Sequence, residues 1–429
     1  MLLSTFFGGV LEWYDFYIYA TASAVVFNVL FFTAEDPVAG VLASFGVLAV
    51  GYVARPLGAV IFSHFGDRFG RKNVLIATLM IIGAASFLIG LLPTYATAGV
   101  LAPIALVVLR LIQGLSAGGE FGGALLMAVE HSAHKRWRGF ASSAATVAQP
   151  IGSLVATAAF AVVTLLPTGD FLGWGWRIPF LLSILIVGVG VWIRLGVAES
   201  PVFQQAAEGH RTGRAPIATV VRSQPGPFVT SIVLAAGLVV FGICVHVFGV
   251  SYAIQVGFSR SEALAALVVA QAVQVFLTPV CAALSDRFGR RPILLIGYLM
   301  QLVMSFLFFS MINTGSTAFL FAGFVVATIA NSFLSGVVGA TLPELFTTDV
   351  RFTGVSVGFS IASVFGGLTP LVAASLVAAA GGAPRHTWLS ITIAAVVLIA
   401  AVVTVRMRET RGTRLTTTAD EQAEMSGQS

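Results

Sequence analysis

Twelve apolar stretches follow one another along the chain, and each is long enough to cross a bilayer as a helix, which takes about 20 mainly apolar residues. A bilayer cannot satisfy open backbone groups, so a spanning segment is either a helix or part of a closed barrel. The short alternating segments of a barrel are not found in this sequence. We therefore predict an all-α integral membrane protein with twelve transmembrane helices. The predicted spans are residues 4–32, 38–65, 73–92, 100–130, 139–166, 174–197, 227–255, 262–284, 292–312, 316–342, 353–380 and 386–407.

The composition excludes a water-soluble protein. Of the 429 residues, 57% are hydrophobic and only 10% are charged, against roughly 25% charged in an ordinary soluble domain. So few charges cannot cover the surface of a soluble fold, which excludes a soluble enzyme, a nucleic-acid-binding protein and a disordered scaffold. The two cysteines, Cys244 and Cys281, lie in apolar stretches, so no disulfide framework is expected.

The basic residues predict the orientation of the spans. If the N-terminus is cytoplasmic, most of the 23 lysines and arginines fall in cytoplasmic loops or in the C-terminal tail, and only Arg177, Arg260 and Arg385 lie in or beside the opposite loops. Cytoplasmic loops of membrane proteins carry such an excess of basic residues. Both termini are therefore predicted to be cytoplasmic, and the net charge of +5 does not indicate a nucleic-acid partner.

The longest polar interruption, residues 198–226, follows the sixth span and divides the chain into two parts. We predict an N-terminal six-helix bundle at 1–197, a cytoplasmic central loop at 198–226 and a C-terminal six-helix bundle at 227–407. Residues 408–429 are polar and aperiodic, so we expect a disordered cytoplasmic tail.

An internal repeat relates the two halves. The sequence DRFGR at 67–71, after the second span, recurs at 286–290, after the eighth. A second similarity follows the fourth and tenth spans. At each place an acidic residue, Glu130 or Glu344, stands shortly before an arginine and a glycine. Matching loops at equivalent places imply duplication, two pseudo-symmetric halves and a substrate site near the midplane between them.

Ionisable side chains inside the predicted spans are concentrated in the first half. Each costs about 2.5–3.5 kcal/mol to insert, so each needs a partner or a function. This asymmetry places coupling chemistry in the first half and leaves the second half to shape the substrate pocket with polar, uncharged side chains or histidine. The ionisable residues are Glu12, Asp15, Arg55, Arg110 and Glu120, and the polar candidates of the second half are His246, Gln255, Gln271, Gln274 and Asn331.

The sequence carries no pattern typical of an enzyme. Its six histidines show no metal-binding spacing within a span, and no glycine-rich phosphate loop is present. We therefore expect no catalytic residues, no metal site and no organic cofactor.

Several motifs, in order, resemble a known family. The loop DRFGRK and the stretch LRLIQGLSAGGEFGG resemble the signatures of the major facilitator superfamily. The stretches GGVLEWYDFYIY, RPLGAVIFSHFGDRFGRK, WGWRIPFLLS, TLPELFTTDVRFTG and GGLTP narrow the resemblance to its metabolite:proton symporter family. Members of that family carry shikimate, α-ketoglutarate, citrate, and proline or betaine.

The resemblance implies a secondary active transporter of the bacterial inner membrane that works by alternating access. The expected activity is import of a small polar organic solute, with an organic acid similar to shikimate or a dicarboxylate favoured, in symport with protons as the coupling ion. The alternatives are a proton-coupled porter of a zwitterion or osmolyte, and a non-transporting sensor on the same fold. The expected partners are the solute and the lipid bilayer, and the expected state is a monomer.

Three residues are predicted to couple protons to transport. Arg110 lies on one face of the fourth span with Gln113, and beside Asp15 it would keep that carboxylate balanced between burial and charge pairing. An acid of the first span facing an arginine of the fourth resembles the arrangement in proton-coupled relatives. Glu12 lies one helical turn from Asp15 and joins the set. The alternative is a permanent ion pair that only holds the helices together.

Candidates for contact with the substrate are polar side chains at depth in the spans. Tyr19 is favoured among the tyrosines of the first span because it lies four residues after Asp15. For each candidate the alternative is ordinary packing within a hydrogen-bonded interior. The full set is Tyr19, Arg110, Gln113, Gln149, His246, Gln271, Gln274 and Asn331.

Two further groups are predicted to govern conformation. Arg55 and Glu120 lie at similar depth in their spans, by the rise of a helix, and form a candidate structural or gating pair. The repeated loops resemble a conformational latch of the family, in which the aspartate meets a helix N-terminus or an arginine of the other half, an interaction of about 0.3–2 kcal/mol. The alternative is that these basic loops only fix the orientation. The latch residues are Asp67, Arg68, Gly70 and Arg71, with Asp286, Arg287, Gly289 and Arg290.

Overall fold

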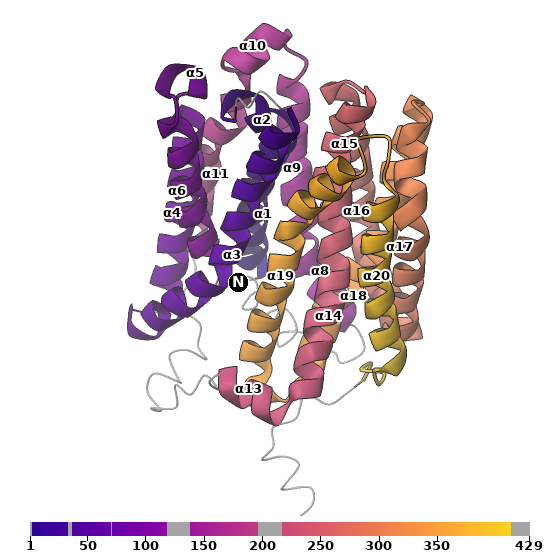
Figure 1. The fold of residues 1–429 in the computed structure, drawn as a ribbon. Helices are drawn as coiled ribbons and strands as arrows, with labels where there is room; N and C mark the ends of the chain where they lie inside the picture. Colours follow the sequence, from indigo (N-terminus) through magenta and orange to yellow (C-terminus); the bar gives the residue numbers. More distant parts are fainter. Residues whose placement is uncertain (1, 33–36, 70, 118–137, 196–216, 413–429) are drawn as a thin grey trace, which may run out of the picture.

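The structure is a computed structural model that describes residues 2–32, 37–69, 71–117, 138–195 and 217–412. It describes the backbone alone at 2–5, 7, 37, 60, 63–69, 71–73, 75, 138, 141, 192–195, 348 and 349. Every element in these ranges is a helix. The long helices run side by side in two groups, the first half of the chain on the left of Figure 1 and the second half on the right.

The first half contributes six membrane-crossing segments. The fifth consists of two helices that meet at Val147. Four short helices, α2 (Phe27–Leu30), α5 (Tyr95–Ala98), α10 (Thr168–Gly173) and η3 (Gly175–Arg177), lie between the long ones. The crossing segments are α1 (Leu2–Val25), α3 (Pro37–Phe69), α4 (Arg71–Leu91), α6 (Leu101–Ser116), α8 with α9 (Arg138–Thr146, Ala148–Val163) and α11 (Ile178–Leu195).

The second half begins with the short helix α13 (Ile217–Ser223) and contributes six more segments. Its first segment is interrupted by one π-helical turn, η4 (Cys244–Phe248), which includes His246. Such turns often mark functional sites within helices. The segments are α14, η4 and α15 (Pro225–Ile243, Cys244–Phe248, Gly249–Val256), α16 (Arg260–Phe288), α17 (Arg290–Asn313), α18 (Thr317–Glu344), α19 (Thr348–Ala379) and α20 (Thr387–Arg406).

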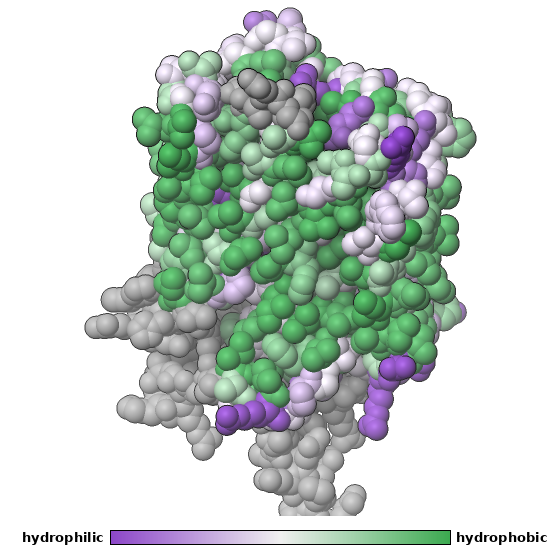
Figure 2. Space-filling model, in the orientation of Figure 1, coloured by the Kyte–Doolittle hydropathy of each residue, from purple (hydrophilic) through white to green (hydrophobic). Residues whose placement is uncertain are grey.

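The predicted twelve-helix architecture is confirmed. Eight helices in the described ranges are long and apolar enough to cross a membrane alone, and the shorter apolar helices Ile76–Leu91, Leu101–Ser116 and Gly175–Val191, together with α1, complete the set. Many large apolar side chains are exposed along their flanks. Figure 2 shows a broad hydrophobic band across the face in view, with hydrophilic residues towards its two ends.

Several predicted boundaries need correction. The first span, predicted to run from 4 to 32, breaks at Val26, whose φ of −144° is not helical, so α1 ends at Val25. The central loop predicted at 198–226 contains α13. The tail predicted from 408 onward has described structure as far as 412, which makes specific contacts described below.

The two halves meet along several helix pairs. α3 packs against α19, α9 packs against α16, and α8 packs against both α16 and α18. At the first of these contacts Gly367 leaves room for the ring of Tyr52, which a Cβ would overlap. The interface therefore brings side chains of α3 to the boundary with the second half.

Within the first half, α3 and α6 approach closely at two glycines. A Cβ on Gly114 would overlap the backbone carbonyl of Gly51, and a Cβ on Gly51 would overlap the Arg110 side chain. Small residues at such crossings let helix backbones pack closely in membranes. This close approach positions Arg110 against α3.

Gly114→Ala is expected to destabilise the first half, because backbone atoms of Gly51 cannot move aside as a flexible side chain would. Overpacking of this kind costs about 1–3 kcal/mol. Thermal unfolding of the purified protein in detergent measures the effect. The matched control is Gly46→Ala, in the partner helix α3, where nothing lies within 4 Å of the added Cβ. Equal melting temperatures for the two variants would contradict this interpretation of the packing.

Candidate functional site

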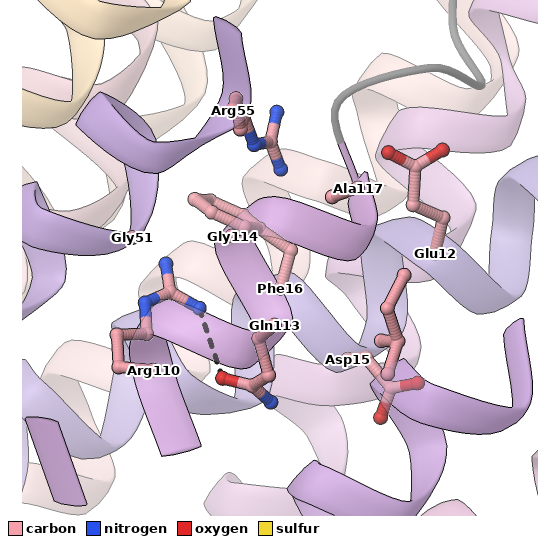
Figure 3. A pocket seen from close by; sticks show the side chains of 10 residues that line it. Glu12, Asp15, Phe16, Gly51, Arg55, Arg110, Gln113, Gly114 and Ala117 are labelled. Atoms are coloured by element: carbon pink, nitrogen blue, oxygen red, sulfur yellow. Dashed lines mark hydrogen bonds between the residues drawn. The ribbon is translucent and has the colours of Figure 1, made fainter. Parts of the chain in front are cut away.

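A pocket inside the first half gathers the buried ionisable residues. On α1 the helical spacing of Glu12, Asp15 and Phe16 places them on one face, towards α3, α4 and α6. The space between its lining atoms is about 280 Å³, part of it open to the outside, and Figure 3 shows how the side chains lie around it. Its lining residues are Glu12, Asp15, Phe16, Gly51, Arg55, Ile82, Arg110, Gln113, Gly114 and Ala117. We call it the charged pocket.

Asp15 lies in this pocket with only 1% of its surface exposed. Its polar neighbours are the hydroxyls of Ser86 and Ser183, yet neither carboxylate oxygen makes a hydrogen bond of normal geometry with a described residue. A buried carboxylate that is not held by an arginine is costly in its charged form. The site is therefore chemically suited to accept and release a proton.

Arg110 does not form the direct ion pair with Asp15 that the sequence analysis expected. Its guanidinium stacks on Tyr19, 4.3 Å from the ring centroid, and on Phe16 at 4.9 Å. One nitrogen, Nη1, donates to Gln113 Oε1 at 3.3 Å, while Nε and Nη2 have no hydrogen-bond partner among the described residues. Figure 3 shows the Gln113 amide between Arg110 and Asp15.

Gln113 links the arginine to the neighbourhood of the acid. Its Nε2 donates to Ser86 Oγ at 2.7 Å, so its amide contacts both Arg110 and Ser86. Because the Ser86 oxygen accepts this bond, its own proton is free to point towards Asp15. A change in the charge of Asp15 can therefore reorient a polar chain that ends at Arg110.

Arg55 also faces the charged pocket, surrounded by aromatic rings. Its Cζ lies 4.6 Å from the centroid of Phe16, 5.0 Å from Tyr52 and 6.0 Å from Trp13. Rings in this position attract a cation through their π faces. The partner predicted for it, Glu120, lies outside the described residues, so the Arg55–Glu120 pair stays a prediction.

A second, larger cavity lies between the two halves, and we call it the central cavity. The space between its lining atoms is about 680 Å³, part of it open to the outside. It is lined by residues of α1, α3, α8 and α9 on one side and of α14, η4, α18 and α19 on the other. The first half supplies aromatic rings, and the second half supplies apolar side chains with a few polar groups. The lining residues are Trp13, Tyr17, Tyr52, Thr146, Gln149, Leu238, Val239, Gly242, Ile243, His246, Asn331, Ser335, Val338, Gly339, Phe359 and Ser363.

Three predicted substrate residues, Gln149, His246 and Asn331, line the central cavity and are held by hydrogen bonds. The Gln149 amide donates to the Tyr17 hydroxyl at 2.7 Å. His246 Nε2 lies 3.2 Å from Thr328 Oγ1, and Asn331 accepts a bond from Gln301 Nε2 at 3.1 Å. These partners fix the side chains at the cavity wall.

The other predicted substrate residues lie elsewhere. Arg110 and Gln113 line the charged pocket, and Tyr19 packs against Arg110. Gln271 donates to Ser153 Oγ at 2.5 Å, across the boundary between α16 and α9. Gln274 is fully buried and its amide has no partner among the described residues.

The central cavity has an aromatic wall that the sequence did not predict, formed by Trp13, Tyr17 and Tyr52. Trp13 and Tyr17 are four residues apart and therefore share one face of α1. That spacing was the available signal, but Tyr19 was favoured instead because of its distance in sequence from Asp15. Tyr52 also keeps its hydroxyl without a hydrogen-bond partner among the described residues.

The second copy of the repeated loop joins the two halves at one end of the molecule. Asp286, near the end of α16, accepts hydrogen bonds of 2.9 Å from the backbone N–H groups of Gly139 and Phe140, in the first turn of α8. Arg290 pairs with Asp286 at 2.8 Å and with Glu344 at 3.2 Å. A carboxylate on the N-terminus of a helix is the contact that the resemblance implied.

The remaining latch residues differ in what the structure describes. Gly289 joins α16 to α17 with a φ of +104°, a left-handed conformation that favours glycine. Arg287 is exposed, and its carbonyl accepts a bond from Arg411 at 2.7 Å. In the first copy, Gly70 and the side chains of Asp67, Arg68 and Arg71 lie outside the described residues.

Part of the predicted tail binds beside the Asp286 contact, which corrects the expectation of disorder for its first residues. Glu409 accepts bonds from the backbone N–H groups of Arg290 at 2.8 Å and Arg291 at 3.0 Å, at the start of α17. Thr410 donates to Glu344 at 2.8 Å. Partial burial raises the pKa of Glu409, but hydrogen bonds from the amides of Arg411, Arg290 and Arg291 outweigh this and hold the pKa below its usual value.

Glu409→Gln is expected to lower the melting temperature near pH 7. A carboxylate whose pKa is lowered by folding stabilises the folded state at neutral pH and loses that contribution as the pH falls through the lowered value. The difference from wild type is therefore expected to shrink below pH of about 4. The control is Asp170→Asn, at an exposed carboxylate. A difference that stays constant from pH 7 to pH 3 would contradict the assigned charge interaction.

Among the described residues no group of three or more His, Cys, Asp or Glu side chains is placed to hold a metal ion. The two cysteines are buried and free. The charged pocket holds buried ionisable side chains, and the central cavity holds aromatic, apolar and polar side chains between the two halves.

Comparison with protein families finds matches over nearly the whole chain. Residues 1–227 match the family described as Sugar (and other) transporter, and residues 247–426 match the Major Facilitator Superfamily. A shikimate transporter of Escherichia coli (strain K12) is 38% identical, with 95% of this chain and 94% of the relative covered. A proline/betaine transporter of the same strain is 30% identical, with 94% and 82% covered.

Solved structures share the fold. A proton:xylose symporter bound to 6-bromo-6-deoxy-D-glucose superposes with a TM-score of 0.74 at 19% identity, over 96% of each chain. A partially occluded, inward-open form of the xylose transporter from E. coli gives 0.73 at 20% identity, over 97% of this chain and 99% of that one. Both comparisons support twelve helices in two halves.

Proposed function

The chain belongs to the major facilitator superfamily, and on that premise we propose that it imports a small organic acid together with protons. It is a membrane transporter and not an enzyme. The observation that carries the proposal is the charged pocket, where Asp15 lies buried and without an ion pair while Arg55 and Arg110 lie nearby.

The charges of this pocket support coupling between a proton and an anion. With Asp15 ionised, the two acids Glu12 and Asp15 balance the two arginines. Protonation of Asp15 leaves one excess positive charge beside the aromatic wall. An excess cation in a low-dielectric interior attracts an anion, so proton binding and anion binding favour each other. The same linkage releases both on the opposite side of the membrane.

The central cavity suits a substrate with a ring and several polar groups. The flat faces of Trp13, Tyr17 and Tyr52 can stack on a ring, while Gln149 and Asn331 can hydrogen-bond to hydroxyl or carboxyl groups. The name of the 38% identical relative, shikimate transporter, makes a hydroxylated ring acid the first candidate. A dicarboxylate is the second member of the same class.

The transport cycle that we propose is alternating access around the central cavity. Both termini lie in the cytoplasm in this scheme, which makes the Asp286 contact with α8 part of a cytoplasmic gate. That contact is then a latch, made while the gate is closed and broken when it opens. A single chain contains both halves and the cavity between them, so a monomer suffices.

Asp15→Asn is expected to abolish proton-coupled uptake. The amide cannot exchange a proton, so substrate binding is no longer linked to the proton gradient. Liposomes containing a pH dye measure lumenal acidification on addition of shikimate, α-ketoglutarate, citrate, benzoate, proline or betaine. The wild type is expected to acidify the lumen when one of the organic acids is added. The rate of acidification by Asp15→Asn is expected to be at least tenfold lower. Asp170→Asn, at an exposed carboxylate of α10, is the matched control.

Two results would overturn this assignment. Saturable uptake of an acid without acidification would remove proton coupling. Unchanged acidification by Asp15→Asn would remove Asp15 from the coupling role. Folded protein that transports nothing in the panel would instead favour a sensor on this fold.

A proton-coupled porter of a zwitterion is the second candidate, favoured by the aromatic wall. Rings such as Trp13, Tyr17 and Tyr52 bind quaternary ammonium groups through their faces, and one relative is a proline/betaine transporter at 30% identity. Betaine uptake that falls at least tenfold in Trp13→Leu, with no uptake of any acid, would establish this alternative.

A further inference from the structure

Helix α16 contacts the first half of the chain at both of its ends. Each contact is made with the terminus of a first-half helix. Near its C-terminus, Asp286 accepts hydrogen bonds from the first turn of α8. At its first residue, Arg260 Nε donates to the carbonyl oxygen of Val25, the last residue of α1, at 3.0 Å. In Figure 1 the α15 end of α16, where Arg260 lies, is at the top. By helix rise the two contacts are separated by about 39 Å.

The Val25 carbonyl is available because α1 stops there. In a continuous helix it would accept from the amide of Val29, but that amide and the amide of Leu30 both bond to Val26, at 3.1 Å. The non-helical conformation of Val26 produces this break. A terminal carbonyl lies at the negative end of the helix dipole, where a cation is favourable.

The surroundings of Arg260 hold its guanidinium against the first half. Its guanidinium lies 6.0 Å from the ring centroid of Phe171, a buried residue of α10 in the first half. The nearby Glu262 is bound elsewhere, to the backbone N–H of Ser259 at 2.9 Å and its hydroxyl at 2.7 Å. No ion pair joins Arg260 to a carboxylate in the described ranges. The two contacts described for Arg260 outside α16, with Val25 and Phe171, therefore belong to the other half.

We propose that Arg260 is a gate residue, which closes the end of the transporter opposite to the Asp286 contact. The two contacts have opposite chemistry: a cation on a helix C-terminus at one end and an anion on a helix N-terminus at the other. Both are formed in this structure, and the central cavity lies between the same two halves. Opening one end separates Arg260 from α1, and opening the other separates Asp286 from α8. The inference rests on the alternating access of the proposed function.

Arg260→Gln is therefore expected to favour the state that is open at the Arg260 end. Spin labels at Thr168→Cys in α10 and Ala318→Cys in α18, two exposed positions in different halves, report the separation at this end. The labelled protein also carries Cys244→Ala and Cys281→Ala, so that only the introduced cysteines are labelled. Double electron–electron resonance on the full chain in nanodiscs, without substrate or gradient, is expected to show roughly a two- to tenfold rise in the long-distance population, as for loss of a helix-end charge.

Three comparisons separate gating from general loosening. Asp286→Asn is expected to shift the same distance distribution the other way, and the double variant to lie between the two single variants. Arg260→Lys, which keeps a cationic donor, is expected to retain most of the closed population. Arg385→Gln is the matched control, because among the described residues Arg385 donates to the carbonyl of Ala380, in its own half. Should Arg260→Gln fail to fold, Phe171→Leu is expected to give a smaller shift in the same direction.

Either of two results overturns the proposal. One is a distance distribution for Arg260→Gln equal to that of Arg385→Gln. The other is a shift of Arg260→Gln in the same direction as Asp286→Asn. Because the distances are measured without transport, failure of proton-coupled uptake in liposomes leaves this test intact, and the two ideas fail separately.

Discussion

The cost of burying charge inside a membrane protein governs how this molecule is arranged. Two acids and two arginines line one small pocket of the first half. Ionised groups at such depth need compensation, and the chain provides it in an incomplete form: aromatic faces for the arginines, and two serine hydroxyls near Asp15. A complete set of ion pairs would hold the charges permanently. The incomplete set leaves a carboxylate that can change its charge, and this freedom is what proton coupling requires.

The charged pocket and the central cavity are adjacent but separate. Phe16 belongs to the first, Trp13 and Tyr52 belong to the second, and the guanidinium of Arg55 lies within 6.0 Å of all three rings. Proton exchange and substrate contact can thus use different residues while sharing one electrostatic field. Helix α16 also makes charged contacts at the two ends of the molecule, where Arg260 and Asp286 each bind the end of a first-half helix.

The sequence was sufficient to predict the fold because hydropathy and the repeated DRFGR loops are local signals. The resemblance to proton-coupled relatives also implied that Asp15 faces Arg110, and both line the charged pocket. It could not show that Gln113 lies between them, since this depends on how α1, α4 and α6 pack. The aromatic wall could not be predicted for the same reason, because Tyr52 reaches the central cavity only where α3 meets α19 at Gly367. The contacts of Glu409 join residues more than a hundred positions apart, so an aperiodic segment gave no sign of them.

Linkage between protonation of the carrier and binding of an anion is the central claim, and calorimetry tests it without any gradient. Titration of the purified protein with shikimate at neutral pH, in two buffers of different ionisation enthalpy, gives the number of protons taken up per substrate bound. The charge balance of the pocket predicts uptake of about one proton, and none in Asp15→Asn. Tight binding with no proton uptake in the wild type would contradict the coupling of anion and proton at this site.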